Sequence, residues 1–190
     1  MVDLHYWPMP FYLASSFRYI LRKMKKESSI LHSNKNENHP MIDHLSLRNW
    51  IQDSGENSIE YFENIDLTHL STMRLKAQGS LVIVKDKTTL RELVRKLFLM
   101  KKRYRLIGWG ANQLLPRESE DLYIKLDFKF EENFKMENGR TYFPASISIQ
   151  KLISLALKHN IDGWELMTGI PASLGGAIFM NAGTKLGEMK

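Results

Sequence analysis

The segment Thr168–Gly183, with the sequence TGIPASLGGAIFMNAG, decides how this chain is interpreted. Proline suits the first turn of a helix because its φ is fixed and it has no N–H to leave unpaired. A helix is therefore predicted to begin near Pro171. The backbone N–H groups of Ala172, Ser173 and Leu174 would point outward at the positive end of the helix dipole, where anions bind. The segment predicts one wall of a site for a phosphate-bearing cofactor.

Two adjacent glycines, Gly175 and Gly176, add to this interpretation. In a helix each of them costs about 1 kcal/mol relative to alanine. Their presence indicates that something lies close against the backbone. Tight turns and close helix packing use the same residues, so this segment alone leaves a purely structural role open.

A second glycine-rich segment is Leu106–Leu115, with the sequence LIGWGANQLL. An apolar strand end precedes two glycines and an asparagine, and such a loop can present consecutive backbone N–H groups to an anion. The segment lacks the third glycine of a dinucleotide fingerprint and the lysine of a P-loop. A simple Rossmann domain and a nucleoside triphosphatase are therefore disfavoured.

The elements around this loop predict a βαβ unit. We expect a strand at Leu81–Lys85, an amphipathic helix at Thr89–Met100 and a returning strand at Tyr104–Gly108. Thr89 and Glu92 have the spacing of a capping box at the start of that helix. The glycine loop then lies at the carboxyl end of a strand, where ligands bind in α/β sheets.

The part of the chain after Leu122–Phe128, a further expected strand, predicts a second lobe. Glu137–Arg140 is expected to form a hairpin turn before a strand at Thr141–Phe143. Ser148 is expected to cap a helix that ends near His159. Trp164, Leu166 and Met167 are expected to pack as core beneath the glycine segment; the alternative for Trp164 is stacking on an adenine ring.

The first 58 residues have poor periodicity and are expected to be loop or disordered. The apolar run within Tyr6–Met24 is interrupted by prolines and is too short to span a bilayer, although a weak interfacial helix is possible. His32, His39 and His44 do not have the spacing of a metal site, and no metal is expected.

At the level of motifs, the chain resembles the flavoenzyme family of UDP-N-acetylenolpyruvoylglucosamine reductase, also called UDP-N-acetylmuramate dehydrogenase, of the MurB type. Ser71–Arg74 is similar to the Thr-Phe-Arg segment of the family, and Gly108–Leu115 to its Gly-x-Gly-Ser-Asn-x-Leu loop. Gly169–Gly187 is close to Gly-Ile-Pro-(Gly/Ala)-(Ser/Thr)-x-Gly-Gly-Ala followed by Met-Asn-Ala-Gly and Gly-Glu. The match runs from about Ile59 to Lys190, which corresponds to about the first half of the family's enzyme.

The resemblance implies an α+β fold, the FAD-binding domain of the vanillyl-alcohol oxidase (PCMH) type, in which two lobes hold FAD noncovalently. It places residues 1–58 in an extension, 59–128 in the first lobe and 129–190 in the start of a truncated second lobe, without a substrate domain. The residues expected along the diphosphate are Gly108, Trp109, Gly110, Ala111 and Asn112. Those expected along the flavin are Gly169, Ile170, Pro171, Ala172, Ser173, Gly175, Gly176, Ala177, Asn181, Ala182 and Gly183.

The resemblance further implies NADPH as hydride donor, a UDP-sugar enolpyruvate as substrate, a role in peptidoglycan precursor synthesis and a cytoplasmic location. Trp109 is bulkier than the residue usual at its position, and Ala111 replaces a serine or threonine whose hydroxyl would face phosphate. The family's Tyr-Arg arginine, its proton-donating serine and its distal glutamate lie downstream of the matched segment. No catalytic residue is therefore assigned, and the 190 residues alone are expected to be inactive.

Composition is that of an ordinary globular chain of 190 residues without cysteine, which excludes disulfides and a cysteinyl flavin link. The net charge of +6 owes much to the basic run Lys85–Arg105. That run falls on the polar face of an amphipathic helix and carries no nucleic-acid motif, so no nucleic-acid partner is expected.

Two alternatives remain open. One is a different FAD-dependent oxidase with the same cofactor fold, against which stands the lack of a histidine in the glycine loops for covalent flavin attachment. The other is a noncatalytic, truncated gene product.

Overall fold

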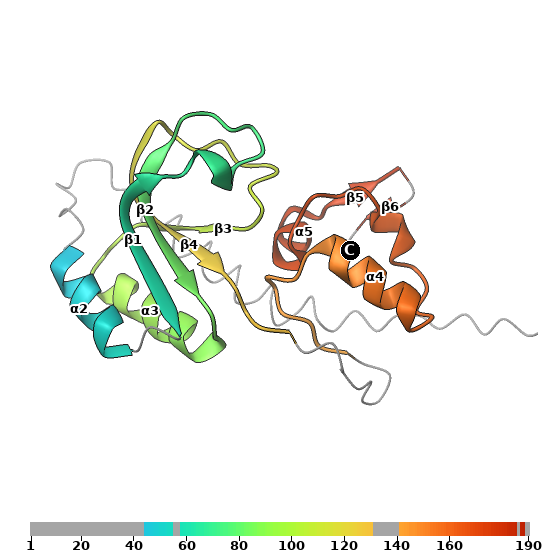
Figure 1. Ribbon diagram of the computed structural model, residues 1–190, viewed down its shortest axis with the longest axis horizontal. Helices are drawn as coiled ribbons and strands as arrows, with labels where there is room; N and C mark the ends of the chain where they lie inside the picture. The colour runs from blue at the N-terminus through green and yellow to red at the C-terminus, as the bar shows by residue number, and fades with distance from the viewer. Residues whose placement is uncertain (1–43, 55–57, 131–140, 186, 189–190) are drawn as a thin grey trace, which may run out of the picture.

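The computed structural model describes residues 44–54, 58–130, 141–185 and 187–188. In Figure 1 these residues form two units of mixed α and β structure. One unit is built around a four-stranded sheet, and the other is built around short helices near the C-terminal end of the chain.

The first unit contains a sheet with the strand order β1-β2-β4-β3. Its strands are β1 (Ile59–Asp66), β2 (Gln78–Val84), β3 (Tyr104–Ile107) and β4 (Glu118–Leu126). β1 runs antiparallel to β2, whereas β4 runs parallel to both β2 and β3. The predicted βαβ unit is therefore present with parallel strands, but β2 and β3 are not neighbours because β4 lies between them.

Two helices cover one face of this sheet (Figure 1). They are α2 (His44–Ser54) and α3 (Lys87–Leu99). Leu47 and Ile51 of α2 are buried in one apolar cluster with strand residues such as Val82 and Ile124. The expectation of loop or disorder for residues 1–58 is thus wrong for α2, since a helix of 11 residues packs there.

The residue that caps α3 is not the predicted one. The N-cap is Asp86, whose Oδ1 accepts from Thr89 N at 2.8 Å and whose Oδ2 accepts from the Thr89 hydroxyl at 2.7 Å. Thr89 is therefore the third helical residue and not the cap. The Asp86 carboxylate satisfies one backbone N–H of the first turn and also accepts from the Thr89 hydroxyl, so Thr89 serves as a donor to the cap and is not the cap itself.

The other face of the sheet carries a separate apolar cluster. Leu81 and Tyr123 are register partners on β2 and β4 and lie on the face opposite to Val82 and Ile124, because neighbouring residues of a strand alternate. This face is covered by chain that connects the strands, including the 3₁₀ turn η1 (Thr68–Leu70). The glycine loop that follows β3 begins on this face, directly after Ile107.

The second unit contains two α-helices, a 3₁₀ turn and two very short strands. These are α4 (Ile149–Lys158), the 3₁₀ turn η2 (Glu165–Met167), α5 (Leu174–Met180), β5 (Gly183–Thr184) and β6 (Gly187–Glu188). The predicted cap of α4 is confirmed, because the Ser148 hydroxyl accepts from Lys151 N at 3.0 Å. The strand expected at Thr141–Phe143 is absent, since that stretch is irregular. The hairpin expected at Glu137–Arg140 lies outside the described residues.

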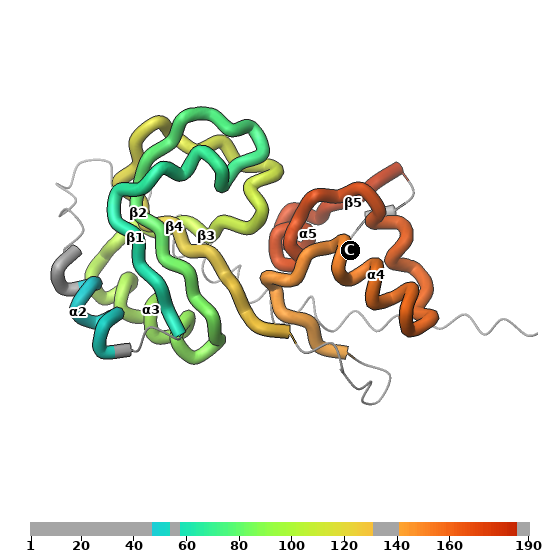
Figure 2. The backbone as a smooth tube through the Cα atoms, viewed as in Figure 1, coloured from blue at the N-terminus to red at the C-terminus, as the bar shows by residue number. Residues whose placement is uncertain are grey.

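The chain path between the two units is visible in Figure 2. The end of β4 and the segment before α4 lie side by side, because Ser146 bonds both main-chain groups of Phe128. Its Oγ accepts from Phe128 N at 3.0 Å and donates to Phe128 O at 3.3 Å. Phe130 and Phe143 pack with ring centroids 5.3 Å apart. These contacts join the two units at one end.

Candidate functional site

The loop after β3 is held from one side by the segment after η1. Thr72 N donates to Gly110 O at 3.2 Å, and the Ser71 hydroxyl donates to Gln113 O at 2.8 Å. The Thr72 hydroxyl makes longer contacts of 3.5 and 3.4 Å to the carbonyls of Gly110 and Ala111. Two motifs that are 38 residues apart, Ser71–Arg74 and Gly108–Leu115, are therefore in direct contact.

All of these bonds use carbonyl groups of the loop. In a trans peptide unit the C=O and the following N–H point in opposite directions. The carbonyls of Gly110 and Ala111 face Thr72, so the N–H groups of Ala111 and Asn112 face away from it. Within the described chain, neither of these N–H groups donates a hydrogen bond to a backbone carbonyl. Ala111 and Asn112 are also exposed, so the loop presents two consecutive N–H groups that have no backbone acceptor among the described residues.

Gly110 is the residue that allows this geometry. Its φ is +65°, and a Cβ at this position would lie 1.9 Å from Leu70 O. Only glycine fits such a backbone in such a space. Trp109, the bulky departure from the family pattern, is 48% exposed and so does not fill the loop.

The start of α5 corrects the prediction made from Pro171. The helix begins at Leu174, with Ser173 as its N-cap, and the Ser173 hydroxyl accepts from Gly176 N at 3.2 Å. The physical reason is a contact with a part of the chain that is distant in sequence. Residues 172–174 pair with residues 147–149 as a short antiparallel bridge, which holds Pro171 and Ala172 outside the helix.

Two backbone N–H groups that were expected to face an anion donate within the protein instead, one in this bridge and one in the segment before it. Leu174 N donates to Ile147 O at 2.8 Å and Ala172 N to Ile170 O at 3.0 Å. The prediction that these two groups point outward is wrong. Gly175 N also bonds within the chain, to Ala145 O at 2.8 Å. Ser173 N, the third group of that prediction, donates to no backbone carbonyl of the described residues, so for Ser173 the prediction stays open.

The glycines of the second segment have different neighbours from one another. A Cβ on Gly175 would lie 2.9 Å from the Ala145 side chain, so what presses on this glycine is the protein itself. A Cβ on Gly169 would meet nothing within 4 Å, although its φ of +87° still favours glycine. The backbone at Gly169 is thus the part of this segment with open space beside it.

The loop after β3 and the start of α5 meet at one point. A Cβ on Gly108 would lie 2.7 Å from the Ser173 hydroxyl oxygen, the atom that caps α5. Ser173 is 5% exposed, so this contact is covered. The structure therefore brings the three sequence motifs together: Ser71–Arg74 contacts the loop after β3, and that loop contacts the start of α5.

The remaining predicted site residues lie before, within and after α5. Ala177 is buried, and Ile170, Ala172 and Ala182 pack against the apolar cluster of the second unit. Asn181 ends α5 with a left-handed φ of 49°. The core positions are confirmed for Met167, which is buried, while Trp164 is partly buried against the same cluster. Stacking of Trp164 on an adenine stays untested.

Two carboxylates, Glu165 before the glycine segment and Asp121 on β4, have structural partners. Glu165 Oε2 accepts from Gly163 N at 2.7 Å, which shapes the turn before η2.

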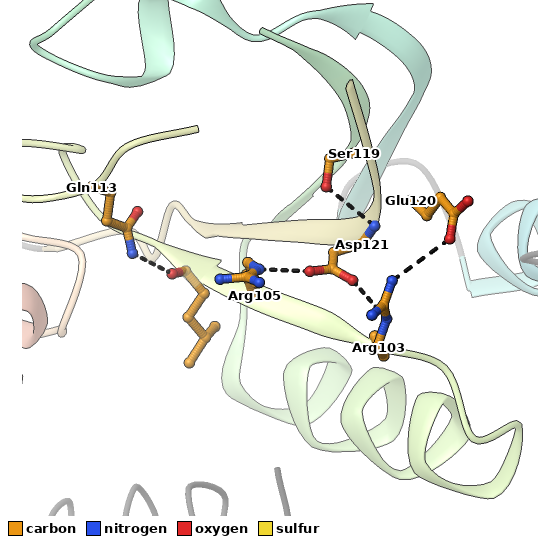
Figure 3. A network of polar contacts seen from close by, with 7 residues as sticks. Arg103, Arg105, Gln113, Ser119, Glu120 and Asp121 are labelled. Atoms are coloured by element: carbon orange, nitrogen blue, oxygen red, sulfur yellow. Dashed lines mark hydrogen bonds and ion pairs between the residues drawn. The ribbon is translucent and has the colours of Figure 1, made fainter. Parts of the chain in front are cut away.

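Asp121 on β4 pairs with two arginines of the neighbouring edge (Figure 3): Arg105 Nε lies 2.6 Å from Oδ2, and Arg103 Nε lies 2.9 Å from Oδ1. The hydrogen bond to Asp121 raises the pKa of Arg105. The spacing of these residues in the sequence does not predict this network, because the network depends on the register between β3 and β4.

Two kinds of site were sought in the described part of the chain. No group of three or more His, Asp or Glu side chains there could hold a metal ion. No helix within 44–54, 58–130, 141–185 and 187–188 is long and apolar enough to cross a membrane.

Comparison with known proteins supports the resemblance found in the motifs. Relatives named UDP-N-acetylenolpyruvoylglucosamine reductase include one from Fervidobacterium nodosum, 34% identical over 80 residues, which are 42% of this chain and 26% of that protein. One from Clostridium botulinum is 32% identical over 117 residues, which are 60% of this chain and 38% of the relative. One from Anaeromyxobacter sp. (strain K) is 37% identical over 86 residues, covering 45% and 26%.

A solved structure shares the fold. The crystal structure of UDP-N-acetylenolpyruvylglucosamine reductase (MurB) from Thermus caldophilus superimposes with a TM-score of 0.53 at 28% sequence identity, over 69% of this chain and 45% of that one. No family model matches the chain. The resemblance and the α+β fold class are thereby confirmed, and the alignments span from 26% to 38% of these curated relatives' length.

Proposed function

We propose that this chain forms part of the FAD-binding domain of a UDP-N-acetylenolpyruvoylglucosamine reductase. The observation that carries the proposal is the convergence of three motifs, 71–74, 108–115 and 169–187, around a loop whose N–H groups at Ala111 and Asn112 have no backbone acceptor in the described residues. Two adjacent donors on an exposed loop suit an anionic diphosphate. The relatives and the solved structure named for this reductase support the choice among FAD proteins.

The residues present fit a noncovalent dinucleotide. In the proposal, the backbone of Gly108–Asn112 holds the diphosphate of FAD, with the carbonyl side of the loop braced by Ser71 and Thr72. Donors that are already fixed by such bracing lose little freedom on binding. The space beside Gly169 belongs to the flavin end of the site. The remaining proposed flavin contacts are Ile170–Ser173, Gly175–Ala177 and Asn181–Gly183.

FAD, when bound, supplies the hydride chemistry, and the chain's own residues bind and orient it. For the whole protein we propose the reaction of the named relatives. FAD would there supply a hydride, taken from NADPH, to the enolpyruvyl group of a UDP-N-acetylglucosamine derivative. Peptidoglycan precursor synthesis in the cytoplasm is the corresponding cellular role. No residue of the present chain is assigned as proton donor in that reaction.

The choice of ligand tests the proposal. FMN has the flavin but lacks the diphosphate bridge and the adenosine, whereas ADP has the diphosphate and lacks the flavin. We expect the purified chain to bind FAD in a fluorescence titration, to bind FMN much more weakly, and to release FAD in competition with ADP. Equal affinity for FAD and FMN would mean that the loop does not recognise the diphosphate.

A charge placed on the loop gives a sharper test. Ala111→Asp puts a carboxylate beside the two N–H groups, where it competes with and repels a diphosphate. We expect FAD affinity to fall by about tenfold or more, which corresponds to about 1.4 kcal/mol. The matched control is Leu157→Asp on α4, an exposed position remote from the loop, which should leave FAD affinity unchanged. Loss of FAD binding in both variants would contradict a specific role for Ala111.

A further inference from the structure

The contact between Gly108 and Ser173 is more than close packing. Gly108 has an ordinary backbone conformation, unlike Gly110 and Gly169, whose φ values are positive. Nothing in its backbone therefore requires glycine. The one neighbour that a Cβ would strike is the Ser173 hydroxyl at 2.7 Å, while the Ser173 Cβ is at 3.9 Å, an ordinary contact distance. The need for glycine at position 108 comes from a single atom of the other unit.

That atom cannot move without cost. The Ser173 hydroxyl accepts from Gly176 N at 3.2 Å and so caps α5. Rotation of the side chain away from Gly108 would break the cap and leave the first turn of α5 short of an acceptor. Ser173 is also buried between the bridge to Ser148 and the loop after β3. An added methyl at Gly108 must therefore either break the cap or push the two units apart.

We infer that Gly108 and Ser173 act as a spacer that sets the separation of the two walls of the cofactor site. The inference rests on the proposed function for the identity of the cofactor, but the contact itself joins the two units whether or not FAD binds. Ser173 is in this sense a positioning residue: the hydroxyl that fixes the start of α5 also fixes how closely the loop after β3 can approach it. A diphosphate and a flavin held by different units need that separation to be correct.

A double-mutant cycle tests the spacer. Gly108→Ala alone should weaken FAD binding about tenfold or more, the usual effect of overpacking a close contact. Ser173→Ala alone loses only the cap and should have a smaller effect. In the double variant the offending oxygen is gone and the new methyl faces the Cβ at an ordinary distance, so FAD affinity should return to that of Ser173→Ala.

A second N-cap provides the matched control. Ser148 caps α4 in the same way, through Lys151 N at 3.0 Å, but does not contact Gly108. Ser148→Ala should therefore fail to rescue Gly108→Ala. A Gly108→Ala chain that binds FAD no worse than Ser173→Ala would overturn the spacer, because the methyl would then have cost only the cap.

A readout that needs no cofactor separates this inference from the proposed function. The chain has no cysteine, so Leu99→Cys on α3 and Leu157→Cys on α4, both about 70% exposed, would be the only two sites for spin labels. Gly108→Ala should shift and broaden the label-to-label distance distribution without FAD, and Ser173→Ala should restore it. An unchanged distribution would overturn the spacer. Failure of every form to bind FAD would contradict the proposed function and leave this result to decide the spacer alone.

Discussion

A single buried hydroxyl offers a test at the scale of the residue. The Tyr123 side chain is 2% exposed, and its hydroxyl has no hydrogen-bond partner in the described residues. An unsatisfied buried polar group costs about 1–3 kcal/mol. We expect Tyr123→Phe to raise the free energy of unfolding by about 1 kcal/mol in a urea titration, as part of that penalty is relieved.

The control for this prediction is a second tyrosine of the sheet. Tyr61 on β1 shares a hydrogen bond with Ser80, and its burial raises its pKa. Tyr61→Phe removes that bond and should lower stability by about 1 kcal/mol. If Tyr123→Phe destabilises the chain as much as Tyr61→Phe does, the hydroxyl of Tyr123 has a partner after all.

Two glycines with positive φ should respond very differently to alanine. At Gly169 the methyl meets open space, so only backbone strain of about 1–2 kcal/mol is expected. At Gly110 the same strain is joined by a clash with Leu70 O, and the total should exceed about 3 kcal/mol. Thermal unfolding of the two variants measures the difference. Equal losses would contradict the packing of the loop against Leu70 and Ser71.

At the scale of the element, the cap of α3 makes stability depend on pH. Hydrogen bonds from the backbone N–H and then the hydroxyl of Thr89 lower the pKa of Asp86. A carboxyl whose folded pKa is lowered contributes fully above its unfolded value of about 3.9, and the contribution is lost as the pH falls through the lowered pKa. Asp86→Ala should cost about 1 kcal/mol at pH 7 and little in strong acid.

A conservative variant at the same position isolates the charge. Asn also caps helices, so Asp86→Asn should keep most of the stability at pH 7 while removing the acid-dependent part. Urea titrations at pH 7 and at about pH 3 compare the two variants with the original chain. A cap without electrostatic character would show the same pH dependence in Asp86→Asn as in the original.

Local sequence rules succeeded where local interactions decide the element. Ser148 was predicted to cap α4, and it does, because the cap depends on residues within one turn. The start of α5 was misplaced at Pro171 because pairing of residues 172–174 with 147–149 overrides the preference of proline for a first turn. A rule that considers only neighbouring residues cannot predict pairing with a segment more than 20 residues away in the sequence.

The helix α2 was missed for a different reason. Leu47, Trp50 and Ile51 have helical spacing, which is the signal that could have identified it. They pack against the sheet, Leu47 and Ile51 being buried and Trp50 partly so. Lys96 of α3 also lies 5.8 Å from the Trp50 ring, a cation–π contact between the two helices. The short helical signal lies within residues 1–58, whose overall periodicity is poor, and so does not stand out.

At the scale of the whole molecule, sequence motifs identified the segments of the candidate site but not which atoms do what. The glycines were expected to make room for a cofactor. In the structure Gly108, Gly110 and Gly175 make room for the protein's own Ser173, Leu70 and Ala145. The donors that we propose for an anion are the N–H groups of Ala111 and Asn112, whose direction follows from the carbonyl bonds of the loop.

The most direct test of the account is to observe those donors while FAD is added. In an amide nuclear magnetic resonance titration of the 190-residue chain, we predict that the N–H signals of Ala111 and Asn112 move among the most and gain protection from solvent exchange. The N–H of Leu174, already bonded to Ile147 O, should change less. Binding of FAD with no change at Ala111 and Asn112, or no binding by a folded chain, would contradict the account.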